Sequence, residues 1–152
     1  MADLDALRYR HDELRRALDI QRDTVDTFHG RANVILIATL GASAFLGVDV
    51  APRAGIGGVI LGVVGIAATT ILFAVILRPR KWGWFAQSAQ LADPALNHPG
   101  VDLEAMLVAA IDALGRCAAH NAPRIHALAK LIIYQGLVAA GTVTLWLILA
   151  IP

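Results

Sequence analysis

A seven-residue repeat occupies the first thirty residues of this chain. Its aspartates are Asp5, Asp12, Asp19 and Asp26, and each is followed three residues later by a basic residue: Arg8, Arg15, Arg22 and His29. Between them, alternating steps of three and four connect Leu4, Leu7, His11, Leu14, Leu18, Gln21, Val25 and Phe28. This spacing predicts one long helix with a coiled-coil seam.

The repeat leads without a proline into the first of three apolar stretches, residues 32–48, 54–77 and 127–151. Each reaches or approaches the roughly 20 residues that cross a hydrocarbon core. The mean hydropathy of +0.62 is also too high for an ordinary soluble domain. We therefore predict an all-α membrane protein with an N-terminal coiled-coil-like helix, three transmembrane helices and a cytoplasmic helical bundle. The expected segments are a heptad helix (1–31), a transmembrane hairpin (32–77), a cytoplasmic region (78–126) and a third transmembrane helix (127–152).

The basic residues predict an orientation. Of the 13 lysines and arginines, only Arg53 lies in the short link, residues 49–53, that we expect between the first two spans. Six precede the first span, and the other six lie after the second span and before the third or, for Lys130, at the mouth of the third. Because cytoplasmic loops are enriched in Lys and Arg, the N-terminus and the 78–126 region are expected inside and the C-terminus outside.

The cytoplasmic region should also be helical. The second apolar helix is expected to continue through Lys81 to about Leu91, before the break at Asp93-Pro94. A further helix should begin near Asp102, and Pro123 should kink its entry to the third span. Its expected seam consists of Leu103, Leu107, Ala110, Leu114, Cys117 and Asn121.

Two features favour self-association. His11 and Gln21 are polar seam residues of the kind that fix register and oligomer number, although His11 could instead sense pH or a ligand. Gly58 and Gly62 form a GxxxG pattern, which allows close helix packing either within one chain or between subunits. We predict a homo-oligomer whose interface includes the heptad seam, Gly58 and Gly62.

A basic cluster, Arg78, Arg80 and Lys81, follows the second span. It can anchor the topology by contacting lipid headgroups, or it can bind a phosphate through bidentate arginine contacts. The row formed by Arg8, Arg15 and Arg22 is a self-paired helix face or, alternatively, a second anion-binding surface. No hydrolase, kinase or zinc-protease motif is present, and His120, Asn121 and His126 lack the spacing of a metal site. We expect no catalysis, no cofactor, no metal and no nucleic-acid partner.

The order of these parts resembles the Pycsar transmembrane effector family and the related two-span SLATT effectors of bacterial cyclic-nucleotide antiphage systems. The resemblance covers about residues 19–149. Its best match is Arg78-Pro79-Arg80 after the second span, and Arg31-Ala32 matches the base and alanine at the entry to the family's first span. The family's acidic residue before that pair is missing here, and Lys130 and Tyr134 stand one turn apart where the family has adjacent Lys-Tyr.

The resemblance implies a bacterial inner-membrane effector. A cyclic pyrimidine nucleotide would bind the cytoplasmic part, with Arg78, Arg80 and Lys81 as ligand-binding residues, and the effector would then disrupt the membrane. The main alternative is a small ligand-free oligomeric channel or scaffold, and a third possibility is an accessory subunit of a larger complex.

Overall fold

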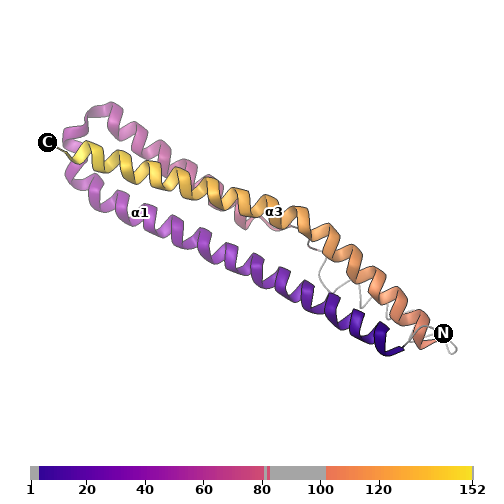
Figure 1. Ribbon diagram of the computed structural model, residues 1–152. Coiled ribbons are helices and arrows are strands. Elements are labelled where there is room, and N and C mark those ends of the chain that lie inside the picture. The colour runs from indigo at the N-terminus through magenta and orange to yellow at the C-terminus, as the bar shows by residue number, and fades with distance from the viewer. Residues whose placement is uncertain (1–3, 81, 83–101, 152) are drawn as a thin grey trace. The chain divides into compact units, whose positions relative to one another are not determined.

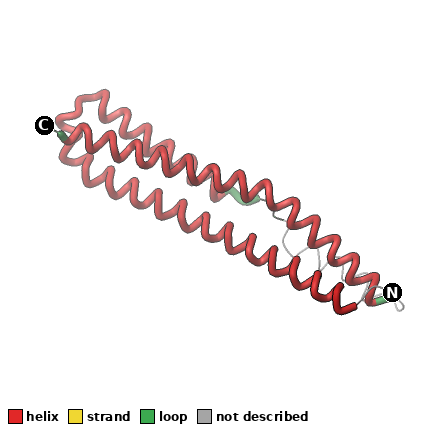
Figure 2. The backbone as a smooth tube through the Cα atoms, in the orientation of Figure 1, coloured by secondary structure: helices red, strands yellow, loops and turns green. Residues whose placement is uncertain are grey.

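The computed structural model describes residues 4–80, 82 and 102–151, and its regular structure there is helical. Helix α1 spans Leu4–Leu77 and helix α3 spans Leu103–Ala150 (Figures 1 and 2). Both contain a stretch that is long and apolar enough to cross a membrane. The all-helical class expected from the sequence is therefore confirmed.

Helix α1 contains one break, at Gly55, whose backbone is non-helical with φ 63° and ψ 172°. This left-handed φ is readily accessible only to glycine. The expected link at residues 49–53 is therefore misplaced, since the chain stays helical through Pro52 and breaks only at Gly55. Proline fixes φ near the helical value, so Pro52 removes one hydrogen bond without forcing a reversal. We call residues 4–54 the first limb of α1 and residues 56–77 the second limb.

The second limb ends at Leu77, and Arg78, Pro79 and Arg80 are not helical. The expected continuation through Lys81 is thus wrong at its start, because a proline disfavours the helical conformation of the residue before it. The remainder of that expectation lies outside the described residues. Helix α3 begins at Leu103, as expected, and Asp102 caps it by accepting a hydrogen bond from the backbone N–H of Glu104 at 3.3 Å. It continues through Pro123 as one helix.

The chain divides into two compact units. Unit 1 comprises Met1–Val25 and Arg80–His126, and unit 2 comprises Asp26–Pro79 and Ala127–Pro152. Each helix contributes to both units. The buried positions keep a seven-residue period along each helix, with Leu18, Val25, Ala32 and Thr39 on α1 and Leu114, Asn121, Leu128, Gln135 and Thr142 on α3.

Unit 1 has an apolar core and a charged surface. Leu18, Leu114 and Cys117 form its buried cluster, and Leu14 and Ala118 pack against that cluster. Gln21 donates a hydrogen bond from Nε2 to the backbone carbonyl of Ala118 at 3.3 Å, which fixes the register of the two helices. Ion pairs within one helix, such as Asp5 with Arg8, lie on the exposed faces. An apolar interior with charged residues outside is the pattern of amphipathic helices.

Unit 2 packs both limbs of α1 against α3. Gly47 of the first limb and Gly62 of the second limb both face the indole ring of Trp146, so the chain reverses at Gly55 and runs back along α3 (Figure 1). Gln135 donates a hydrogen bond from Nε2 to the carbonyl of Ala32 at 3.1 Å, which joins α3 to the first limb. Because Ala32 and Gly47 meet Gln135 and Trp146 in the same chain order, the first limb runs parallel to α3 in this unit.

Candidate functional site

The interior of unit 2 contains polar residues beside apolar ones such as Ile76 and Leu128, whereas its surface is apolar. Five of the six buried polar residues in the described part of the chain belong to this unit, namely Thr39, Ser43, Thr69, Gln135 and Thr142. The exposed side chains include Phe45, Ile60, Val64, Ile71 and Leu137. In water this distribution would leave a large apolar surface uncovered, whereas in hydrocarbon it is favourable.

Small residues allow the three helical segments of unit 2 to approach closely. A Cβ atom at Gly62 would collide with the indole ring of Trp146, and one at Gly65 would collide with the side chain of Thr142. A Cβ atom at Gly58 would lie 3.1 Å from Cδ1 of Leu149. Of the two alternatives for the GxxxG pattern, packing within one chain is therefore the one that the structure contains at Gly58 and Gly62.

The heptad seam likewise faces α3 of the same chain in unit 1. Leu18 and Val25 are buried, Leu7, His11, Leu14, Gln21 and Phe28 are partly buried, and Leu4 is exposed. His11 Nδ1 lies 3.2 Å from Oδ1 of its neighbour Asp12. The role of this seam in oligomerisation stays a prediction, since the structure contains a single chain.

The basic cluster follows the end of the second limb. Arg78 and Pro79, with Ile71, Ala74, Val75 and Leu77, line an otherwise apolar hollow of about 460 Å³ in unit 2. In unit 1, the carbonyl of Arg80 accepts a hydrogen bond from the backbone N–H of Trp82 at 3.0 Å. Among the residues that the structure describes, neither Arg78 nor Arg80 forms an ion pair. Lys81 lies outside the described residues.

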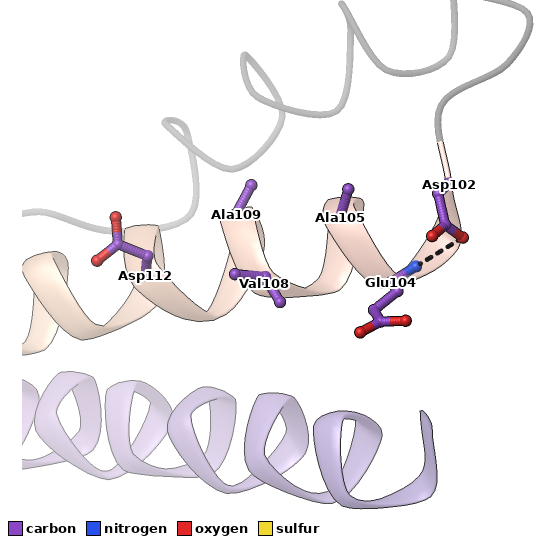
Figure 3. A pocket seen from close by; sticks show the side chains of 6 residues that line it. All are labelled: Asp102, Glu104, Ala105, Val108, Ala109 and Asp112. Atoms are coloured by element: carbon purple, nitrogen blue, oxygen red, sulfur yellow. Dashed lines mark hydrogen bonds between the residues drawn. The ribbon is translucent and has the colours of Figure 1, made fainter. Parts of the chain in front are cut away.

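A second hollow, of about 630 Å³, lies on the first turns of α3 in unit 1 (Figure 3). It is lined by Asp102, Glu104, Ala105, Val108, Ala109 and Asp112. The carboxylates of this hollow would repel a phosphate, and Asp112 is paired with Arg116 on the same helix. The hollow therefore does not suit a nucleotide.

No group of His, Cys, Asp and Glu side chains that could hold a metal ion occurs in the described part of the chain. The single cysteine, Cys117, lies in the apolar cluster of unit 1.

Sequence reasoning did not single out Gln135. Its signal was positional, because it lies seven residues after Leu128 and seven before Thr142 on the buried face of α3. Thr39, Ser43, Thr69, Thr70, Thr142 and Thr144 are the mildly polar residues of the apolar stretches. The structure separates them into a buried group and an exposed pair, Thr70 and Thr144.

Comparison with known protein families, with curated proteins and with solved structures gives no significant match to this chain.

Proposed function

We propose that the protein is a non-enzymatic membrane effector of bacterial antiphage defence, which a cyclic nucleotide activates to disrupt the inner membrane. The apolar exterior of unit 2 and the polar residues in its interior carry the membrane part of this proposal. Every polar group in a bilayer must find its partner within the protein, and large apolar side chains can face lipid without cost. Unit 2 satisfies the second condition along both limbs of α1 and along α3.

In this proposal the two limbs of α1 and the C-terminal part of α3 are three transmembrane helices. The reversal at Gly55 and the parallel course of the first limb and α3 support three crossings. With 12 of the 13 lysines and arginines on one side, the N-terminus is cytoplasmic and the C-terminus is outside. Unit 1, with its charged surface, is then the cytoplasmic part.

Arg78, Arg80 and Lys81 are the proposed contacts for a cyclic pyrimidine nucleotide. The support is the resemblance at Arg78-Pro79-Arg80 and the absence of an ion pair at either arginine among the described residues. Arginine gives bidentate, charge-assisted contacts to phosphate. The same contacts could be made to lipid headgroups, so the test must distinguish the two sources.

The protein is proposed to act as a homo-oligomer, and the support is the heptad repeat with its polar seam residues His11 and Gln21, which are of the kind that fix oligomer number. The alternative hypothesis is a ligand-free oligomeric channel or scaffold. It has the same membrane fold but needs no nucleotide.

Co-expression with a pyrimidine nucleotide cyclase, read by a membrane-potential dye, tests this proposal. Expression of the effector alone should be tolerated, whereas expression with the cyclase should depolarise the membrane. In detergent, 3′,5′-cyclic UMP or CMP should raise the melting temperature, since a ligand that binds only the folded state stabilises it.

Arg78→Gln with Arg80→Gln should abolish both responses, since each charge-assisted contact contributes about 1.5–3 kcal/mol. Arg53→Gln is the matched control, because this exposed arginine belongs to the opposite side of the proposed topology. If the double variant binds the nucleotide normally but loses only its membrane retention, these arginines contact headgroups. A wild type that neither binds a cyclic nucleotide nor depolarises cells would favour the ligand-free reading.

A further inference from the structure

The five buried polar residues of unit 2 form a group that the proposed function leaves without a role. We call Thr39, Ser43, Thr69, Gln135 and Thr142 the polar stripe, and each is at most 5% exposed. Thr39 and Ser43 come from the first limb of α1, Thr69 from the second limb, and Gln135 and Thr142 from α3. All three helical segments therefore turn hydroxyl or amide groups toward the interior.

Gly65 brings two of these residues together. The side chain of Thr142 lies directly against Gly65, where a Cβ atom would collide with it. The hydroxyl of Thr69 donates to the carbonyl of the same Gly65 at 2.9 Å. The second limb and α3 thus meet at hydroxyl groups, at a depth where the outer face carries Val63 and Val64.

Three buried polar atoms of this interior have no hydrogen-bond partner among the described residues: Ser43 Oγ, Gln135 Oε1 and Trp146 Nε1. They represent an amide acceptor, an indole donor and a hydroxyl that can do both. Buried groups of this kind are normally paired, either within the protein or with ordered water. Lipid cannot supply such partners, whereas water held between the helices can.

We propose that the polar stripe is hydrated in the resting protein and lines the path along which water and small ions cross the membrane when the effector acts. The inference that the stripe is hydrated rests on the unpaired atoms and does not require the proposed function. The role as a permeation path rests on the proposed function, because it requires that the protein makes the membrane leak.

Cysteine accessibility tests this inference with controls that the chain itself provides. Thr69 and Thr70 are neighbours on one helix, and each donates its hydroxyl to the carbonyl four residues earlier at 2.9 Å. Thr69 is buried, whereas Thr70 is exposed. On α3, Thr142 is buried and Thr144 is exposed, which gives a second pair. Each pair compares one residue type at nearly the same membrane depth, once buried and once exposed.

The experiment uses the full chain with Cys117→Ala, reconstituted in phosphatidylethanolamine–phosphatidylglycerol vesicles without added nucleotide. Single variants Thr69→Cys, Thr70→Cys, Thr142→Cys and Thr144→Cys are exposed to aqueous Ag⁺, an ion of about the size of K⁺. The vesicles are then denatured, remaining thiols are alkylated with N-ethylmaleimide, and the protein is weighed by mass spectrometry. Ag⁺ binds the thiolate, which forms in water and not in lipid. Protection should therefore be at least about tenfold faster for Thr69→Cys and Thr142→Cys than for their partners.

Equal protection within both pairs, or none at any position, would overturn the inference, whether or not the vesicles leak. Faster protection at the buried member of each pair supports hydration. The permeation role is then tested by measuring K⁺ efflux from the vesicles after addition of 3′,5′-cyclic UMP or CMP. Thr69→Val with Thr142→Val should reduce efflux, and Thr70→Val with Thr144→Val should not. Efflux that is insensitive to the first pair would overturn the permeation role. A protected stripe in vesicles that never leak would instead contradict the proposed function and leave the hydrated interior standing.

Discussion

Units 1 and 2 use the same helices and the same seven-residue period, but they differ in the types of side chain that are buried and exposed. In unit 1 the period places Leu18, Leu114 and Cys117 inside and charged residues outside. In unit 2 it places Thr39, Gln135 and Thr142 inside together with Ala32 and Leu128, while Phe45, Ile60 and Leu137 face outward. The same geometry of buried positions thus holds different side chains in the two units, and in the proposed function this difference reflects water around unit 1 and lipid around unit 2.

The physical reason is the source of the driving force. In water, burial of apolar area stabilises the folded state by about 25 cal/mol per Å², so the period must select leucine and valine. Hydrocarbon gives no such gain for apolar side chains, and helices associate there through close backbone approach and polar contacts. The buried positions of unit 2 accordingly include Ala32, Thr39, Gln135 and Thr142 beside apolar residues such as Leu128.

The largest expected effect is a charge in the core of unit 1. Leu18→Asp places a carboxylate at a position that is 2% exposed, and burying an unpaired charge should cost at least about 3 kcal/mol. Ile20→Asp is the matched control, because Ile20 is 65% exposed on the same helix. Hydrogen exchange and limited proteolysis should show unit 1 opening only in Leu18→Asp.

Native mass measurement of the same variants addresses the assembly. If the seam packs only against α3 of its own chain, Leu18→Asp should unfold unit 1 locally and leave the oligomer mass of the folded fraction unchanged. A clean conversion of a folded oligomer into a folded monomer would show that the seam is a subunit interface instead.

An intermediate effect should follow from a charge on the outside of each unit. Phe45 and Tyr9 are both exposed aromatics on the first limb, at 76% and 72%. Phe45→Lys should oppose membrane insertion by up to about 2.5–3.5 kcal/mol, which is the penalty for a lysine at the centre of a transmembrane helix. The penalty is smaller towards the helix ends, and Phe45 lies nearer the end than the centre of the apolar stretch 32–48. Tyr9→Lys should change insertion and stability by less than about 0.5 kcal/mol, since surface substitutions in water are usually mild.

Glycosylation-mapping of insertion and detergent unfolding measure this pair. Similar small effects for both variants would mean that the exposed face of unit 2 does not contact lipid. The two units would then not differ in their surroundings.

The smallest effect should come from one methyl group inside unit 2. Gly62→Ala would drive a Cβ atom into the indole ring of Trp146, and overpacking of this kind costs about 1–3 kcal/mol. Gly57→Ala meets nothing within 4 Å, and alanine should stabilise the helix there by about 0.5–1 kcal/mol. Steric trapping or thermal unfolding in bicelles should therefore shift the two variants in opposite directions.

If Gly62→Ala were as stable as Gly57→Ala, the close packing of the second limb on Trp146 would be wrong. If Gly62→Ala also changed the hydrogen-exchange protection of unit 1, the two units would not respond independently to a substitution.

The sequence alone determined the helices and the period of their buried faces. The repeat from Leu4 to Phe28 predicted a seam whose best-buried members are Leu18 and Val25, and Asp102 marked the start of α3. Local signals of this kind are readable because capping and heptad spacing act within a few residues along the chain. The basic cluster at Arg78 and Arg80 was also visible as residues, although its ligand stays a proposal.

The contacts that each helix face makes became known only from the tertiary structure. The heptad pattern is not recognisable in the sequence after Phe28, because the buried residues that continue it, Ala32 and Thr39, have no large apolar side chain. The break at Gly55, the contact of Gly62 with Trp146 and the bond from Gln135 to Ala32 join residues far apart in the chain. A glycine or a glutamine in an apolar stretch has the same local pattern whether it faces lipid, a neighbour or a second subunit. Its surroundings distinguish these cases, and they exist only once the helices have packed.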